Sequence, residues 1–206
     1  MKVLLINGSP HEEGCTYTAL KEVAGALEKN GIKTEFLYLG KKPVAGCTAC
    51  QHCTKTGTCV VDDQVNQVLS RLPELDGIVV GSPVYYAGAS GQLTAFLNRL
   101  FYAGGGRFAG KPGAAVVSCR RGGASAAFDQ LNKYFTISGM PVAPSQYWNQ
   151  VHGFTPADVR QDLEGMQTMR TLGNNMAWLL RCIELGRANG VTMPAREKPV
   201  MTNFIR

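Results

Sequence analysis

The sequence of 206 residues lacks an apolar run that approaches the ~20 residues needed by a membrane-spanning helix. Its N-terminus also lacks the basic, apolar and small-residue succession of a secretory signal, because Lys2 precedes only a strand-length apolar run. These absences argue against both a membrane protein and a secreted one. We therefore expect a cytoplasmic protein with one domain over residues 1–190 and a C-terminal tail over residues 191–206.

A concentrated basic surface is also missing, although the net charge of +6 would allow nucleic-acid binding. The 21 Lys and Arg residues are scattered, with only short pairs such as Lys41-Lys42 and Arg120-Arg121. Nucleic-acid-binding proteins usually gather these residues on one face or along one helix. We therefore expect no nucleic-acid partner, and we interpret the charge as a mildly basic surface that also attracts anionic substrates.

A disulfide framework is not expected either, because cytoplasmic proteins rarely keep disulfides and this chain has seven cysteines without a secretory context. Three of the cysteines are scattered, at Cys15, Cys119 and Cys182. A small buried thiol is the expected state of each of these three side chains.

The other four cysteines crowd into 13 residues, as Cys47, Cys50, Cys53 and Cys59. Their compact spacing suits the ligands of a [4Fe–4S] cluster, whereas structural zinc usually takes two well-separated pairs. Gly57 lets the chain bend back so that the fourth thiol can join the other three. Three states stay open for this segment: an iron–sulfur cluster, empty thiols in a loop, and a zinc site.

The remaining sequence alternates strand-like and helix-like patterns, which predicts an α/β fold with a mostly parallel sheet. Strands are expected at residues 3–6, 34–39, 77–81, 114–118 and 141–144. Helices are expected at residues 16–30, 62–72, from about 90, 124–138 and 156–188, with Gly165 and Gly173 marking a bend or a close contact. We expect a flavodoxin-like, doubly wound sheet of five parallel strands in the order 2-1-3-4-5, with helices on both faces and a cysteine-bearing excursion over residues 40–61.

The stretch after the first strand predicts a phosphate site. A glycine-containing loop over residues 8–15 leads directly into the first helix, so backbone N–H groups and the positive end of the helix dipole converge. The hydroxyls of Ser9, Thr16 and Thr18 can add further donors. An ordinary strand–turn–helix with capping hydroxyls is the alternative interpretation of the same residues.

Three familiar phosphate-binding patterns are missing from this loop. No lysine follows Gly14, as a triphosphate loop requires, and no arginine lies near Cys15, as a small tyrosine phosphatase requires. The G-x-G-x-x-G spacing of a dinucleotide fold is absent too, and the second strand ends without a carboxylate. A monophosphate held by hydroxyls and backbone remains, and FMN is the leading candidate.

Ligands of such sheets bind outside the carboxyl ends of the strands, where the strand order reverses. Three loops are expected there: the first loop (residues 9–18), the second loop (residues 82–91) and the third loop (residues 119–125). A flavin ring needs an aromatic platform, which Tyr85 and Tyr86 can supply. Arg120 and Arg121 can neutralise charge at the N1–O2 edge of the flavin, bind a pyridine-nucleotide phosphate, or remain a solvated pair.

The loops also resemble a known family. Asn7-Gly8-Ser9-Pro10 with Thr16, and Gly81-Ser82-Pro83-Val84-Tyr85-Tyr86 followed by Ser90-Gly91-Gln92-Leu93, resemble the NAD(P)H-dependent FMN reductases of the flavodoxin-like superfamily over about the first 140 residues. With the cysteines, the chain is similar to the iron–sulfur flavoprotein branch. The first loop departs from the family, which often has Arg or Lys where this chain has His11-Glu12-Glu13, so the two carboxylates are expected to be solvated.

The resemblance implies that FMN phosphate binds the first loop, that the isoalloxazine lies against residues 83–86, and that residues 120–123 lie near the ring edge. No side chain is expected to act as a catalytic nucleophile, because the flavin carries the chemistry. The expected cofactor-binding residues are Ser9, Pro10, Cys15, Thr16, Tyr17, Thr18, Pro83, Val84, Tyr85, Tyr86, Gly88, Arg120, Gly122 and Gly123.

Two functions follow from these expectations. The leading one is an FMN-dependent NAD(P)H oxidoreductase that passes hydride from NAD(P)H to FMN and on to a quinone, a flavin, or a nitro or azo compound. The alternative is an iron–sulfur flavoprotein that carries electrons through FMN and a [4Fe–4S] cluster. The partner is then a small redox substrate or a redox protein. The apolar helices predict a homodimer or homotetramer.

Overall fold

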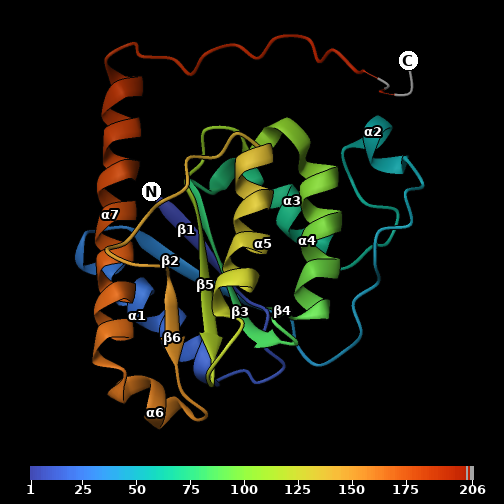
Figure 1. Cartoon of the computed structure of the whole chain (residues 1–206). Helices are drawn as coiled ribbons and strands as arrows, with labels where there is room; N and C mark the ends of the chain where they lie inside the picture. The colour runs from blue at the N-terminus through green and yellow to red at the C-terminus, as the bar shows by residue number, and fades with distance from the viewer. Residues whose placement is uncertain (203, 205–206) are drawn as a thin grey trace.

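The computed structural model describes residues 1–202 and 204 of the chain. Its sheet contains five parallel strands in the order β2-β1-β3-β5-β6 (Figure 1). These are β1 (Lys2–Asn7), β2 (Lys33–Tyr38), β3 (Gly77–Tyr85), β5 (Gly113–Cys119) and β6 (Gln150–His152), and the short β4 (Gly88–Ala89) pairs antiparallel with the end of β3. Counted along the chain without β4, the parallel strands have the predicted order 2-1-3-4-5.

Helices cover both faces of the sheet, as expected (Figure 1). One face carries α1 (Cys15–Lys29) and α7 (Leu163–Ala188), with α6 (Pro156–Gln161) beside them. The other face carries α3 (Gln64–Arg71), α4 (Gly91–Gly104) and α5 (Ala124–Ile137). Shorter elements are α2 (His52–Thr56) in the cysteine excursion and the 3-10 turns η1 (Leu72–Glu74) and η2 (Gly105–Phe108).

Each central strand supplies both hydrophobic cores, because successive side chains point to opposite faces of a sheet. In β1, Val3 and Leu5 join the core under α1 and α7, whereas Leu4 and Ile6 join the core under α3, α4 and α5. All four side chains are buried. A strand with apolar residues at successive positions is therefore buried on both faces, as is usual for an inner strand of a parallel sheet.

The strand predicted at residues 141–144 is wrong. Only an isolated bridge between Gly113 and Val142 forms there, and the fifth parallel strand is β6, later in the chain. Pro141 and Pro144 carry no backbone N–H, so this segment cannot supply a regular ladder.

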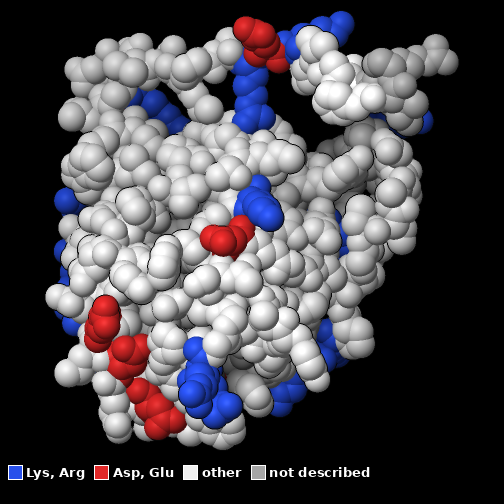
Figure 2. Space-filling model, in the orientation of Figure 1, with Lys and Arg blue, Asp and Glu red and all other residues white. Residues whose placement is uncertain are grey.

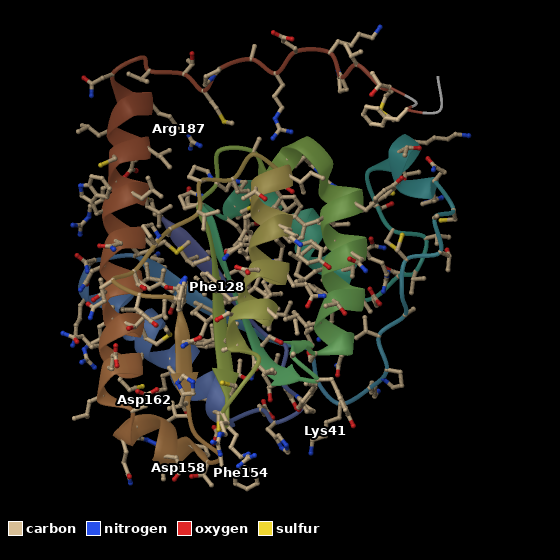
Figure 3. All side chains as sticks on the ribbon, in the orientation of Figure 1. Lys41, Phe128, Phe154, Asp158, Asp162 and Arg187 are labelled. Carbon is tan, nitrogen blue, oxygen red and sulfur yellow. The ribbon has the colours of Figure 1, made fainter. Side chains whose placement is uncertain are left out.

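The helix predicted over residues 156–188 is divided into α6 and α7, with the break at Asp162. The Asp162 carboxylate accepts hydrogen bonds from the backbone N–H of Gly165 at 2.9 Å and of His152 at 2.7 Å. It therefore caps α7 and ties the break to the end of β6. Asp162 lies with Asp158 and Phe154 at the lower end of the molecule, near the carboxyl ends of the strands (Figure 3).

Beyond α7, the chain runs extended across the top of the molecule (Figure 1). The Arg196 guanidinium donates to the Ser138 carbonyl at 2.7 Å and attaches this segment to the end of α5. Lys and Arg residues lie in separate groups over the visible face rather than in one stripe (Figure 2). Among the described residues, none of the helices combines the length and apolar character that crossing a membrane requires.

Gly173 brings α7 against α1. A Cβ atom at this position would lie 2.6 Å from the Ala26 Cβ and 2.7 Å from the Val23 carbonyl oxygen. The close contact expected at this glycine is therefore confirmed. Because Gly173 has no side chain, α1 and α7 can pack closely against each other on their shared face of the sheet.

We expect the Gly173→Ala variant to lose about 1–3 kcal/mol in free energy of unfolding, because the added methyl overpacks the α1–α7 contact. Gly25→Ala in α1 is the matched control, since nothing lies within 4 Å of a Cβ there. That control should be neutral or gain about 0.5–1 kcal/mol through helix propensity. Urea unfolding measures both variants, and equal effects would show that the α1–α7 contact at Gly173 is not tight.

Candidate flavin and cysteine sites

The three predicted loops meet at the carboxyl ends of β1, β3 and β5. Ser90 Oγ donates to the Gly8 carbonyl at 2.7 Å and joins the second loop to the first. In the third loop, Gly123 packs so closely on the second loop that a Cβ would lie 2.7 Å from the Ala87 Cα. Gly123 also has φ of +90°, a conformation that favours glycine. The structure therefore brings together the three segments that the sequence predicted around one ligand.

The first loop is shaped by Asn7, the last residue of β1, which is 1% exposed. Its Oδ1 accepts the Ser9 N–H at 3.1 Å, and its Nδ2 donates to the Glu12 carbonyl at 2.9 Å. One side chain thus folds the loop over the end of the strand. The sequence offered a signal for this role, because a polar amide ends an otherwise apolar strand.

The first turn of α1 has open backbone donors. Gly14 is the N-cap residue, and no side chain of the described residues caps this helix. Ser9 Oγ accepts the His11 N–H at 3.1 Å, which leaves its own hydroxyl hydrogen free to donate. In contrast, Thr16 Oγ1 lies 2.8 Å from Ser118 Oγ, and Thr18 Oγ1 donates to the Gly14 carbonyl at 3.0 Å. The backbone N–H groups and the Ser9 hydroxyl are therefore open donors, whereas Thr18 uses its hydroxyl hydrogen on Gly14; in the Thr16–Ser118 pair either hydroxyl can be the donor.

Other residues of the first loop attach it to neighbouring strands. The Pro10 carbonyl accepts the Tyr38 hydroxyl at 2.8 Å, and the Tyr17 ring lies 5.2 Å from an aromatic ring of β2. Cys15 Sγ lies 3.8 Å from the Gly153 carbonyl oxygen, and burial raises the pKa of this thiol. These residues position the loop, and their direct contact with a cofactor stays a prediction. Glu12 and Glu13 are exposed, as expected.

The second loop presents an aromatic hairpin. Pro83 and Val84 are half-buried at the end of β3, whereas the Tyr86 side chain is fully exposed. Tyr86 and Ala87 have φ of +50° and +59° and form the two-residue connection between β3 and β4. Such hairpin turns favour Asn and Gly, so two other residues here carry backbone strain of the kind that functional sites retain.

The glycines of the second loop leave open space beside this hairpin. A Cβ at Gly88 would make only an ordinary 3.6 Å contact, and one at Gly91 would meet nothing within 4 Å. Tyr85 is partly exposed, and burial of the remainder raises the pKa of its phenol. A side chain at either glycine would therefore meet no close neighbour beside the hairpin, and the contact of a flavin ring with this hairpin stays a prediction.

The third loop carries two exposed cations. The guanidinium groups of Arg120 and Arg121 have no hydrogen-bond or ion-pair partner among the described residues. The Cys119 thiol donates to the Arg121 carbonyl at 3.6 Å and closes the loop, and Gly122 is open to solvent. The two arginines are thus free to meet a negatively charged group next to the second loop.

The four clustered cysteines line one pocket of the excursion. Residues 46–51, Cys53 and residues 59–61 form its walls, and Arg99, Tyr102 and Ala103 of α4 complete it. Cys53 and Cys59 are half-buried and pack on the core, whereas Cys47 and Cys50 are exposed. Gly57 has φ of +71° and ends α2, so it makes the predicted bend before the fourth cysteine.

The thiols of this pocket influence one another. Burial is the largest cause that raises the pKa of the Cys53 thiol, and the charges of the other three cysteines raise this pKa further. Among the described residues, no three His, Cys, Asp or Glu side chains are arranged to hold a metal ion. The cysteines therefore share a space without forming a single-ion site. In a [4Fe–4S] cluster each thiolate binds a different iron, so the four sulfurs lie farther apart than they do around a single metal ion.

Backbone strain is concentrated at the two candidate sites. In the described part of the chain, four non-glycine residues have positive φ: Ala49, Gln51, Tyr86 and Ala87. The first two flank Cys50, and the other two form the aromatic hairpin. Such conformations persist only where the surroundings enforce them, and they gather at sites that bind ligands.

The three scattered cysteines have different surroundings. Cys119 is buried, as expected, and Cys15 is half-buried. The prediction for Cys182 is wrong, because this thiol is exposed on α7. A helix that covers a sheet turns one side outward, and the apolar pattern alone did not assign Cys182 to that side.

The chain matches a family model described as NADPH-dependent FMN reductase over residues 1–155. An iron–sulfur flavoprotein of Methanocaldococcus jannaschii is 34% identical over 192 residues, which cover 89% of this chain and 100% of that protein. Relatives from Methanosarcina thermophila and Archaeoglobus fulgidus carry the same description. A putative NAD(P)H-dependent FMN-containing oxidoreductase of Bacillus subtilis is 27% identical over 99 residues, or 48% of this chain and 51% of that protein.

Solved structures show the same fold. A flavodoxin from the domain Archaea superposes with a TM-score of 0.60 at 18% identity, covering 88% of this chain and 99% of that protein. At this identity the likeness concerns the fold alone, and it confirms the flavodoxin-like arrangement predicted from the sequence.

Replacing Asn7 should weaken FMN binding. In Asn7→Ala, the Ser9 N–H and the Glu12 carbonyl lose their partner, at about 1–3 kcal/mol for each group left unsatisfied, so we expect at least a tenfold lower FMN affinity. Asn175→Ala is the control. Asn175 lies on α7, away from the loops, and its side-chain amide donates to the Pro144 carbonyl. Flavin fluorescence titration measures both. Full affinity in a folded Asn7→Ala protein would contradict this role.

Proposed function

We propose that this chain, which belongs to the NADPH-dependent FMN reductase family, is an iron–sulfur flavoprotein that carries electrons between FMN and a [4Fe–4S] cluster. As a family member it is a flavin-dependent oxidoreductase. One observation carries the finer proposal: the four cysteines line one pocket in a chain that matches an iron–sulfur flavoprotein over that protein's full length. This reverses the order of the two functions that the sequence suggested.

The proposed cluster ligands are Cys47, Cys50, Cys53 and Cys59. Compact cysteine sets of this kind hold [4Fe–4S] clusters. Of the four side chains, Cys53 and Cys59 lie half-buried on the core side of the pocket, and Cys47 and Cys50 lie exposed on its solvent side. The strained backbone around Cys50 supports a bound group, since a loop without one has little reason to keep that conformation.

The proposed FMN site uses the three loops. When bound, FMN accepts or delivers one or two electrons, and the protein orients it and tunes its potential. The open N–H groups of α1 and the Ser9 hydroxyl bind the phosphate, and residues 83–86 support the ring. Arg120 and Arg121 supply positive charge at the ring edge, where negative charge grows on reduction.

An NAD(P)H-dependent FMN oxidoreductase is the second candidate. The free guanidinium groups of Arg120 and Arg121 support this candidate, because they suit the phosphate of a pyridine nucleotide as well as the edge of the flavin ring. The open face of the aromatic hairpin leaves room for a nicotinamide or for an acceptor such as a quinone, a flavin, or a nitro or azo compound. The description of the Bacillus subtilis relative is consistent with this activity.

We also propose a homodimer or homotetramer in the cytoplasm, with a small redox substrate or a redox protein as partner. Large apolar side chains are exposed at several places, among them Tyr86 on the hairpin and Trp178 and Leu185 on α7. A second copy that covers such side chains would remove apolar surface from water, which is the usual driving force for association.

Protein prepared without oxygen should contain about four irons per chain and absorb broadly near ~400 nm. Cys50→Ser should lose the iron and keep FMN, because the three flavin loops do not include residue 50. Cys182→Ser is the matched control, since it removes an exposed cysteine outside the pocket and should keep both cofactors. Iron analysis and flavin absorbance measure the outcome, and iron-free wild-type protein would refute the cluster.

The two functions differ in their electron donor. As an electron carrier, the protein should be reduced quickly by dithionite under anaerobic conditions, whereas NADH and NADPH should bleach the flavin only slowly. Stopped-flow absorbance measures these rates. Rapid bleaching by either nucleotide that slows in the Arg120→Ala, Arg121→Ala double variant would contradict the carrier and support the second candidate.

A further inference from the structure

Arg99 is a buried cation outside the flavin loops. It lies in α4 among apolar neighbours, and its side chain is 1% exposed. Charged side chains are almost never buried so completely unless they have partners. The flavin loops make no use of this residue, so its position calls for a separate explanation.

All five N–H donors of Arg99 have acceptors in the cysteine excursion or at its end. Nε donates to Cys59 Sγ at 3.2 Å, and the two Nη groups bind the Asp63 carboxylate at 2.7 and 2.9 Å. The Nη groups also donate to the carbonyls of Ala45 at 3.4 Å and Val61 at 2.9 Å. One side chain therefore holds the excursion both before and after its cysteines.

Cys59 is held by a second residue as well. Asn66 of α3 accepts the Cys59 N–H at 2.8 Å and donates to the Cys59 carbonyl at 3.0 Å. The backbone and the sulfur of this cysteine are thus both fixed by the folded body. Cys47 and Cys50, in contrast, are exposed on the outer side of the pocket.

The charge of Arg99 remains effective at the pocket although Asp63 neutralises it formally. The Asp63 side chain is 33% exposed, so water screens it, whereas the arginine is out of contact with water. Asp63 Oδ1 is also shared, because it accepts the Val65 N–H at 3.0 Å as the cap of α3. The sulfur of Cys59 therefore lies next to a desolvated cation and receives one of its hydrogen bonds.

We propose that Arg99 is a positioning residue that presents Cys59 as the preformed ligand of the cluster and raises the reduction potential of that cluster. The inference rests on the proposed function, because it requires a cluster on these cysteines. Uptake of one electron adds one negative charge to the cluster. A cation and an N–H donor at a ligand sulfur stabilise this reduced form more than the oxidised form, which makes reduction more favourable.

The test compares the wild type with Arg99→Gln and Arg99→Lys. The glutamine variant removes the charge, and the lysine variant keeps the charge but loses the planar fork of donors. Arg107→Gln is the matched control, because Arg107 also holds the excursion, through the Gly57 carbonyl, without contacting a sulfur. Each anaerobic protein is titrated with dithionite while the signal of the reduced cluster is followed by electron paramagnetic resonance, with the flavin potential as internal reference.

We expect Arg99→Gln to lower the equilibrium constant for reduction of the cluster at least tenfold, which is 59 mV for one electron. Arg99→Lys should shift it less, and Arg107→Gln should leave it unchanged. If Arg99→Gln holds no iron while Arg107→Gln does, the positioning role is supported, and Arg99→Lys reports the potential. Unchanged potentials in both Arg99 variants with full iron would overturn the inference alone. Iron-free wild-type protein would overturn the proposed function together with it.

Discussion

The parallel pairing of β1 between β2 and β3 is the constraint on which the rest of the structure depends. It places the carboxyl ends of all the parallel strands at one edge of the sheet, so the first, second and third loops begin next to one another. It also requires β1 to be apolar on both faces, with cores above and below it. The flavin site is then a consequence of strand order, completed by contacts such as Ser90 to Gly8.

Helix α4 supports both candidate sites. Its N-cap residue Ser90 joins two flavin loops, and Arg99, nine residues later, holds the cysteine excursion. At 1.5 Å per residue, these two anchors are about 14 Å apart along the helix axis. The apolar face of the same helix fills the core beneath β3, so the burial that stabilises the fold also fixes the separation of the two anchors.

Both sites combine local strain with strong attachment. Positive φ at Ala49, Gln51, Tyr86 and Ala87 costs conformational free energy in the free chain. Buried hydrogen bonds and packing nearby offset that cost, through Asn7 and Gly123 at the flavin loops and through Arg99 and Asn66 at the excursion. Strain held in this way keeps a site in shape before its ligand arrives.

The sequence by itself determined the features that depend on neighbours along the chain. Apolar patterns identified β1, α1 and α3, and cysteine spacing marked the pocket, because each depends on a few consecutive residues. Tertiary structure alone decided that Thr16 meets Ser118 and that Arg99 meets Cys59. It also decided that β6, rather than residues 141–144, completes the sheet. These pairings join residues 33 to 102 positions apart, and only the packing of the whole chain selects a partner at such separations.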